Sequence, residues 1–177
     1  MIILMGVAGA GKSMQGKILA DEHGFAWIST GEILRVLVTG KRRQEMLEGK
    51  LLSDEEMINL MDKVLELIDT KEEFVLDGFP RTVPQADWLL EQVQDGRFPL
   101  SAIVHLTASE EVVRSRLLDR GRQDDTEEAI AKRFTEYRTS TVPILEHLRN
   151  EGGKVCDIDA AQDPRDVHDA ILRCLDI

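Results

Sequence analysis

The sequence has few cysteines and no long apolar run, and each shortage excludes a class of protein. Only Cys156 and Cys174 are present among 177 residues, and neither has a partner at the spacing of a zinc-ligand pair. This usage argues against a disulfide framework or a zinc knuckle, so we expect two buried, unreactive thiols. No segment approaches the roughly 18 consecutive apolar residues of a membrane span, so no membrane association is expected.

Basic residues are also in deficit. The 22 Lys and Arg against 33 Asp and Glu give a net charge of −11, which argues against a nucleic-acid partner because binding to the phosphate backbone relies on a broadly basic face. An apolar run at residues 2–5 leaves no room for a cleavable presequence, so a cytoplasmic location is expected. With 42% hydrophobic residues and no internal repeat, the chain can build one substantial core, which predicts a single domain.

A glycine-rich stretch, Gly-Val-Ala-Gly-Ala-Gly-Lys-Ser at residues 6–13, directly follows that apolar run. It matches the pattern of a phosphate-binding loop at every fixed position. In such a loop the glycines let backbone N–H groups turn toward an anion, Lys12 reaches the outer phosphates, and the Ser13 hydroxyl ligates Mg²⁺. The loop predicts a nucleoside triphosphate ligand, but GTPases, transporters and small-molecule kinases all share it.

Strand-like and helix-like segments alternate along the chain. Buried strands are predicted at 2–5, 26–28, 74–76, 102–106 and 154–158, with helices between them and after the last. Residues 53–56 have the spacing of a capping box, as do residues 107–110, and the long helix after Asp125 is expected to break before Pro143. The pattern predicts an α/β fold with a parallel five-stranded sheet covered by helices on both faces. Ligands bind beyond the carboxyl ends of such strands, so the glycine-rich loop, Asp77 and Thr107 should face one crevice.

Together with the glycine-rich loop, four further segments resemble the adenylate kinases. They are Ile-Ser-Thr-Gly-Glu-Ile-Leu-Arg at 28–35, Gly-Lys-Leu-Leu-Ser-Asp at 49–54, Asp-Gly-Phe-Pro-Arg-Thr-Val-Pro-Gln-Ala-Asp at 77–87, and a run from Arg122 to Glu128 that continues to Arg133 and Tyr137. The order and spacing fit the family, and the signature from Asp77 to Gln85 is highly specific. The resemblance implies a P-loop NTPase-like core at 1–29, 70–118 and 126–177, a helical flap for the nucleoside monophosphate at 30–69, and a short lid at 119–125.

The implied reaction is reversible phosphoryl transfer from Mg-ATP to AMP, giving two ADP. Such transfer needs alignment and neutralisation of crowded negative charge, a task for arginine, lysine and Mg²⁺. For ATP the resemblance implies Gly9, Ala10, Gly11, Lys12, Ser13, Met14 and Arg116, with Arg116 over the adenine. Mg²⁺ would be held by Ser13 and, through water, by Asp77. For AMP it implies Thr30, Gly31, Arg35, Gly78, Arg81 and Gln85. The catalytic set would be Lys12, Arg81, Arg120, Arg122 and Arg133, with Asp124 and Asp125 orienting the lid arginines.

Some features depart from the family pattern. The loop lysine is usually followed there by Gly-Thr, whereas this chain has Ser13 and Met14, so the hydroxyl stands one position earlier. The short lid carries no cysteines, so no zinc is expected, and four scattered histidines without ligand spacing are expected to be structural. Short-lid members of the family are often monomers, so a monomer is expected. Its expected partners are the small molecules ATP, AMP and ADP.

Other functions stay open. The similar uridylate and cytidylate kinases commonly carry Ala where Thr30 stands, so Thr30 favours AMP over another monophosphate. A non-catalytic nucleotide sensor would keep the loop but could lose the transfer arginines, which this chain retains. A GTPase switch would need an Asn-Lys-x-Asp guanine reader, and neither Asn59 nor Asn150 begins one.

Overall fold

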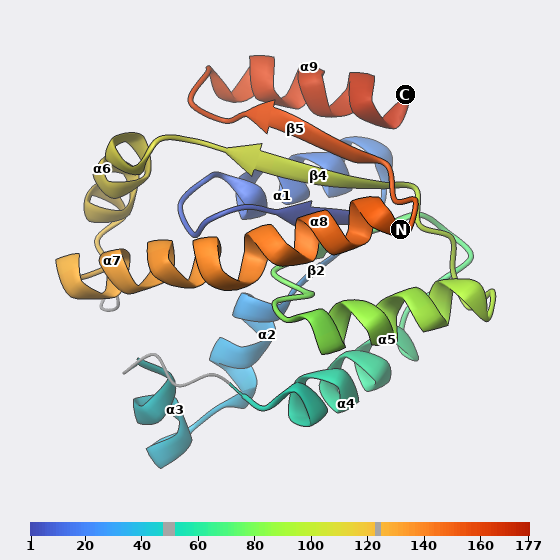
Figure 1. Cartoon of the computed structure of the whole chain (residues 1–177), viewed down its shortest axis with the longest axis horizontal. Helices are drawn as coiled ribbons and strands as arrows, with labels where there is room; N and C mark the ends of the chain where they lie inside the picture. The colour runs from blue at the N-terminus through green and yellow to red at the C-terminus, as the bar shows by residue number, and fades with distance from the viewer. Residues whose placement is uncertain (48–51, 123–124) are drawn as a thin grey trace.

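Five parallel strands form a single sheet at the centre of the fold (Figure 1). The computed structural model describes residues 1–47, 52–122 and 125–177. The strands are β1 (Ile2–Met5), β2 (Ala26–Ser29), β3 (Phe74–Asp77), β4 (Ala102–Thr107) and β5 (Val155–Asp159), in the order β2-β3-β1-β4-β5. All four neighbouring pairs are parallel. The predicted fold class is therefore confirmed, and each predicted strand is found to within one residue at either end.

Helices cover both faces of the sheet. The helices of the described residues are α1 (Lys12–His23), α2 (Thr30–Leu37), α3 (Gly40–Leu47), α4 (Asp54–Leu65), α5 (Val83–Gln94), α6 (Glu110–Arg120), α7 (Glu127–Glu136), α8 (Val142–Asn150) and α9 (Pro164–Leu175). Because side chains alternate along a strand, Ile3 of β1 joins a core with α4, α5 and α8. Its neighbours Ile2 and Leu4 join a second core with α1, α6, α7 and α9. In Figure 1, α8 crosses in front of the strands and α9 lies along β5.

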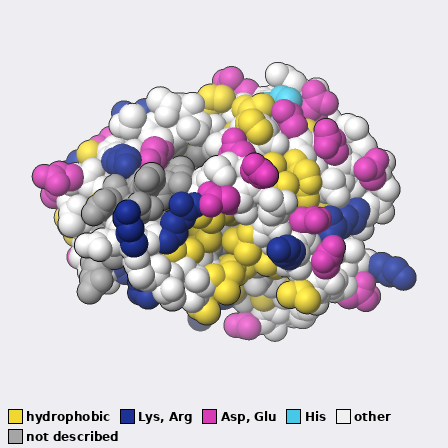
Figure 2. Space-filling view, turned by 90° about the horizontal axis from the view of Figure 1, so that it is seen from below, with side chains coloured by type: hydrophobic (Ala, Val, Ile, Leu, Met, Phe, Trp, Pro, Cys, Tyr) yellow, Lys and Arg dark blue, Asp and Glu magenta, His cyan; other side chains and the backbone are white. Residues whose placement is uncertain are grey.

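Helices α2, α3 and α4 lie in the lower part of the molecule in Figure 1, below the strands. The predicted capping box at the start of α4 is confirmed, because Ser53 Oγ accepts from the Glu56 N–H while the Glu56 carboxylate accepts from the Ser53 N–H. The apolar stripe of α4 packs into the core. Val36 and Leu37 at the end of α2 stay exposed, and in Figure 2, which views this part from below, apolar side chains gather between interspersed acidic and basic ones.

The expectation of two unpaired thiols is wrong. Cys156 on β5 and Cys174 on α9 form a disulfide, with an S–S length of 2.08 Å and a Cα–Cα distance of 6.2 Å. Because α9 folds back along β5, residues 18 positions apart in the sequence come face to face. Spacing along the chain does not reveal that contact.

The predicted break before Pro143 is also wrong. The backbone runs from α7 into α8 through one π-helical turn, Tyr137–Thr141, in which the Val142 N–H donates to the Tyr137 carbonyl. Pro143 lies in the first turn of α8, and the widened turn before it accommodates a residue that lacks an N–H and crowds the preceding turn.

At the start of α6, the capping residue is Ser109 rather than Thr107. Ser109 Oγ accepts from the Val112 N–H, whereas Thr107 Oγ1 donates to the Ile158 carbonyl on β5. Across the described residues, no helix has the length and apolar character needed to cross a membrane.

Candidate active site

The glycine-rich loop joins the end of β1 to the start of α1, at the carboxyl edge of the sheet. Gly6, Gly9 and Gly11 have φ values of 136°, 90° and 99°, which other residues rarely adopt. A Cβ on Gly6 would lie 2.4 Å from the Leu106 carbonyl oxygen, and one on Gly9 would lie 2.8 Å from Leu117 Cγ. Glycine thus lets the loop pass close to β4 and α6. Helix α1 begins with no side-chain cap, which leaves its first N–H groups for an anion.

Lys12 folds back over the loop. Its Nζ donates to the carbonyl oxygens of Gly6 at 2.8 Å and Val7 at 2.9 Å. Burial lowers the pKa of Lys12 to about 8, and although the charge of Asp77 opposes this shift, nearby arginines add to it. A cation that is desolvated among other cations gains when an anionic phosphate approaches.

The two residues predicted to hold Mg²⁺ lie together. Ser13 Oγ, in the first turn of α1, donates to Asp77 Oδ2 over 2.6 Å, and Asp77 is buried at the end of β3 with 3% exposure. Carboxylate and hydroxyl oxygens are hard ligands of the kind Mg²⁺ prefers, with water completing an octahedron. The residues present therefore fit a magnesium site beside the loop.

Asp125 joins two of the predicted catalytic arginines. Its carboxylate accepts two hydrogen bonds from Arg120, at 2.8 and 2.6 Å, and one from Arg133 at 2.8 Å. Burial alone would raise the pKa of Asp125, but these bonds outweigh it and lower the pKa to about 2. An ionised carboxylate thus holds arginines from α6 and α7 side by side. Asp124, expected to act with it, lies outside the described residues.

Arg35 on α2 and Arg81 after β3 lie close enough for the charge of one to act on the other. Arg35 pairs with Glu32 at 2.6 Å, and Arg81 Nε donates to the Gly78 carbonyl at 2.8 Å. Desolvation lowers the pKa of Arg81, and the charges of Arg133 and Arg35 lower it further. Cations from three elements therefore lie close enough to influence one another, as a site for a polyanion requires.

Arg122 reaches from the end of α6 toward α2. Its guanidinium lies 3.9 Å from Glu32 Oε1, and the backbone N–H of Arg122 donates to Asp125 Oδ2 at 3.2 Å. Glu32 therefore faces arginines of two different segments, and bonding to Arg35 contributes most to its lowered pKa.

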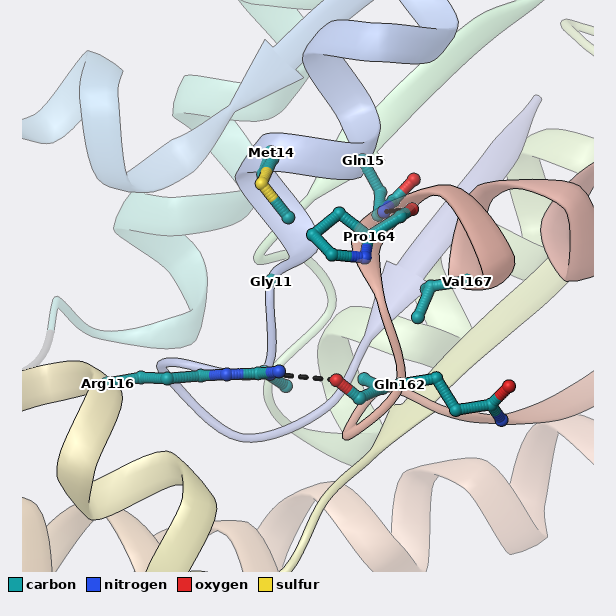
Figure 3. A pocket seen from close by; sticks show the side chains of 9 residues that line it. Gly11, Met14, Gln15, Arg116, Gln162, Pro164 and Val167 are labelled. Atoms are coloured by element: carbon teal, nitrogen blue, oxygen red, sulfur yellow. Dashed lines mark hydrogen bonds between the residues drawn. The ribbon is translucent and has the colours of Figure 1, made fainter.

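A pocket opens beside the loop, between α1, α6 and the start of α9 (Figure 3). Arg116 lies across it and donates to the Ala160 carbonyl at 2.8 Å. A flat guanidinium facing apolar walls is suited to a planar aromatic ligand such as a nucleobase. The other lining residues are Ala10, Gly11, Met14, Gln15, Gln162, Pro164 and Val167.

Comparison with known proteins gives a consistent result. The model of the family described as adenylate kinase matches residues 4–153. The adenylate kinase of Corynebacterium urealyticum is 38% identical over 181 residues, covering 99% of this chain and 98% of that protein. That of Nitrobacter hamburgensis is 37% identical over 191 residues, covering 99% and 91%. Adenylate kinase 1 of a Nostoc species is 38% identical over 172 residues, covering 94% and 93%.

The chain belongs to the adenylate kinase family. It is thereby a nucleotide-binding transferase, a nucleoside monophosphate kinase, as its motifs predict. The family match spans the loop, Asp77 and the arginines of α6 and α7, the same parts that the fold gathers at the carboxyl edge of the sheet.

In this member of the adenylate kinase family, the predicted base-reading residues are bonded to the protein itself. Thr30 Oγ1 donates to the Gly78 carbonyl at 3.0 Å. Gln85 accepts from the Arg81 N–H and donates to Asp54 Oδ1, each at 2.8 Å. Both side chains are buried, so a base would contact them through the hydrogen-bonding capacity that these partners leave free: the Thr30 hydroxyl lone pairs, and one N–H and one oxygen lone pair of the Gln85 amide. Gly31 packs beside the Arg35 guanidinium, which would lie 3.5 Å from a Cβ there.

Sequence reasoning missed two parts of the site. Asp54, at the start of α4, accepts from both Thr82 and Gln85; the resemblance covers its segment without indicating this role. The pocket wall at residues 160–167 gives no sequence signal, because Ala160 contributes a backbone carbonyl that any residue would supply.

Proposed function

We propose that the chain catalyses reversible transfer of the γ-phosphoryl group of Mg-ATP to AMP, giving two ADP. The observation that carries this assignment is the convergence of Lys12, the bonded pair Ser13 and Asp77, and the arginines held by Asp125 at one edge of the sheet. The acceptor is already an anionic phosphate, so the reaction needs alignment and charge neutralisation rather than a strong base.

Donor and acceptor fit different parts of this edge. The glycine-rich loop and α1 start would hold the donor phosphates, and its base would lie in the pocket under Arg116, beside Met14. Arg35 and Arg81 would grip the acceptor phosphate, where a guanidinium can make two parallel hydrogen bonds. Lys12, Arg81, Arg120, Arg122 and Arg133 would stabilise the charge that develops during transfer. Mg²⁺ bound at Ser13 and, through water, at Asp77 would neutralise charge on the donor phosphates.

The chain would divide into a core at 1–29, 70–118 and 126–177, a flap at 30–69 and a short lid at 119–125. The approach of lid Arg122 to flap Glu32, at 3.9 Å, supports closure of these two segments over the substrates. Closure excludes water and so prevents loss of the phosphoryl group to hydrolysis.

AMP as acceptor rests on Thr30 and Gln85. Thr30, at the start of α2, bonds to Gly78 just after β3, and Gln85 on α5 bonds to the backbone of Arg81. The hydroxyl of Thr30 and the amide of Gln85 suit the edge of adenine. The first alternative is a uridylate or cytidylate kinase, and the second is a nucleotide sensor without catalysis. The sensor is disfavoured because the arginines expected for transfer are all present. A monomeric state and a cytoplasmic location remain predictions, the first testable by light scattering.

A coupled assay for ADP decides between these functions. With Mg-ATP we expect AMP to be the best acceptor among AMP, dAMP, UMP, CMP and GMP. Arg81→Ala should lower kcat/KM by about 10² or more, the effect of losing one transition-state donor. Arg138→Ala is the matched control, because Arg138 lies on the turn after α7 and pairs at the surface with Glu110. Absence of ADP above background hydrolysis with every acceptor would leave the sensor, and a preference for UMP or CMP would replace AMP.

A further inference from the structure

Two histidines and a glutamate meet on the surface where α1 and α9 lie together. Glu22 and His23 are the last residues of α1, His168 belongs to α9, and one ligand atom from each lies within 4.8 Å of the others. His168 is buried with 7% exposure, whereas Glu22 and His23 are open to solvent. Because Glu22 and His168 are 146 positions apart in the sequence, spacing along the chain gives no sign of the cluster.

Gln15 fixes which nitrogen of His168 carries hydrogen. The Gln15 amide Nε2 donates to the Pro164 carbonyl at 2.9 Å, so its Oε1 is the atom that lies 3.2 Å from His168 Nδ1. An amide oxygen only accepts hydrogen bonds, so Nδ1 must be the donor. In a neutral ring the other nitrogen, Nε2, then presents a bare lone pair.

That lone pair faces a second acceptor. His168 Nε2 lies 3.0 Å from Glu22 Oε2, and a lone pair against a carboxylate is unfavourable unless a cation sits between them. The cation can be a proton or a metal ion. A metal ion would take both atoms and the nearby ring nitrogen of His23. Ligand atoms at about 2.0–2.2 Å from a tetrahedral ion lie roughly 3.3–3.6 Å from one another.

We propose that Glu22, His23 and His168 bind a transition-metal ion of the Zn²⁺ type. Two imidazoles and one carboxylate are a ligand set known for zinc, with the fourth position left to water, whereas Mg²⁺ prefers an all-oxygen shell. The bond from Nδ1 to Gln15 is the outer contact that a metal-bound histidine usually makes with its second nitrogen. The proposal departs from two expectations: that the histidines are structural, which rested on their spacing along the chain, and that no zinc is bound, which rested on the absence of cysteines from the lid.

The metal would join the end of α1 to α9, two elements that lie far apart in the sequence. It would bind the folded chain and not the separated ligands of the unfolded one, so it should raise the melting temperature, and the rise should grow with the logarithm of the ratio of free metal concentration to Kd. Gln15 and Pro164, which complete the contact to His168, also line the pocket under Arg116. The metal site therefore adjoins the proposed donor site without sharing a ligand with it.

The test is calorimetric titration of EDTA-treated, dialysed protein with ZnCl₂, with the disulfide intact and no nucleotide present. We expect saturable binding of one equivalent, and His168→Gln and Glu22→Gln should each weaken it at least about tenfold. His23→Asn, at an exposed position, tests the site with little risk to folding. His147→Asn is the matched control. His147 is likewise paired with a carboxylate, that of Asp87 at 2.6 Å, but lies outside the proposed site, so its replacement should leave Zn²⁺ affinity unchanged.

Co²⁺ substitution identifies the ligands. Four-coordinate Co²⁺ bound by nitrogen and oxygen gives visible bands without the near-ultraviolet thiolate transition, and a Cys156→Ser Cys174→Ser variant should give the same spectrum. Lack of one-equivalent binding, or wild-type affinity in all three site variants, would overturn the metal site and leave a proton between His168 and Glu22. Kinase activity of each variant is assayed separately, so failure here is distinguishable from failure of the proposed reaction.

Discussion

Ser13 and Asp77 are 64 positions apart in the sequence, yet the hydroxyl of one donates to the carboxylate of the other over 2.6 Å. Ser13 lies in the first turn of α1 and Asp77 ends β3, and the parallel pairing of β1 with β3 brings these two places together. A hydroxyl that stands one position earlier than in the usual Gly-Thr arrangement thus still meets a carboxylate. The pair supports the proposed magnesium site.

Replacing Ser13 tests that pair. Ser13→Ala removes one oxygen and leaves Asp77 without its hydrogen bond, so we expect kcat/KM to fall about 10- to 100-fold. The Mg²⁺ concentration for half-maximal rate should rise. Steady-state assays over a Mg²⁺ series measure both, and Ser115→Ala, which removes an exposed hydroxyl on α6, is the control. An unchanged Mg²⁺ dependence would remove Ser13 from the metal site.

The pKa of Lys12 predicts the alkaline limb of the rate profile. Burial lowers this pKa to about 8, so Lys12 is charged at pH 7 and loses its proton as the pH rises through 8. Because kcat/KM reports the free enzyme, it should fall above about pH 8 when ATP is varied, while kcat should fall at a higher pH because bound phosphate stabilises the charged amine. Lys12→Arg, which cannot deprotonate in this range, should lack the limb. A kcat/KM that stays flat to pH 9.5 would contradict the assignment.

The alternation of segments was sufficient to predict the fold. Five short apolar runs with helices between them can hardly be arranged otherwise than as a parallel sheet with helices on both faces. The π-helical turn was not predictable, because a proline inside a helical pattern normally ends the helix. Nor was the pairing of Cys156 with Cys174, which depends on how α9 lies against β5.

The site was predictable where a residue type carries the chemistry. Lys12, Asp77 and the arginines are recognisable because phosphate and metal binding need those side chains. The wall at Ala160 was not, since its contribution is a backbone carbonyl. The hydrogen bonds of the Gln85 side chain were not predictable either, because its partners are Asp54 on α4 and the backbone of Arg81, which the fold brings to it.

Gly6 tests how closely the loop passes β4. Gly6→Ala combines a positive φ with a Cβ only 2.4 Å from the Leu106 carbonyl oxygen, so we expect the free energy of unfolding to fall by about 3 kcal/mol or more. Gly152→Ala is the matched control: its φ is 85° with nothing within 4 Å of the added Cβ, so about 1 kcal/mol is expected. Urea denaturation of both variants gives the difference, and equal losses would show that the loop has room to move.

The charge of Asp125 makes the stability of the folded chain depend on pH. Its pKa in the folded chain, about 2, lies below the ordinary value of 3.8, so the stabilisation is fully present above pH 4 and is lost as the pH falls toward 2. By linkage it amounts to about 2 kcal/mol. Asp125→Asn should therefore be less stable than the wild type by at least about 2 kcal/mol at pH 7, and this gap should close between pH 4 and pH 2.

Urea denaturation at a series of pH values measures the gap. The control is Asp119→Asn, which changes an exposed carboxylate near the end of α6 and should leave stability nearly unchanged. Because Asp125 also holds Arg120 and Arg133, the Asn variant should lose kcat at pH 7 even at temperatures where it stays folded. If the difference in stability persisted unchanged to pH 2, the packing of the Asp125 side chain, and not its charge, would be what stabilises the folded chain.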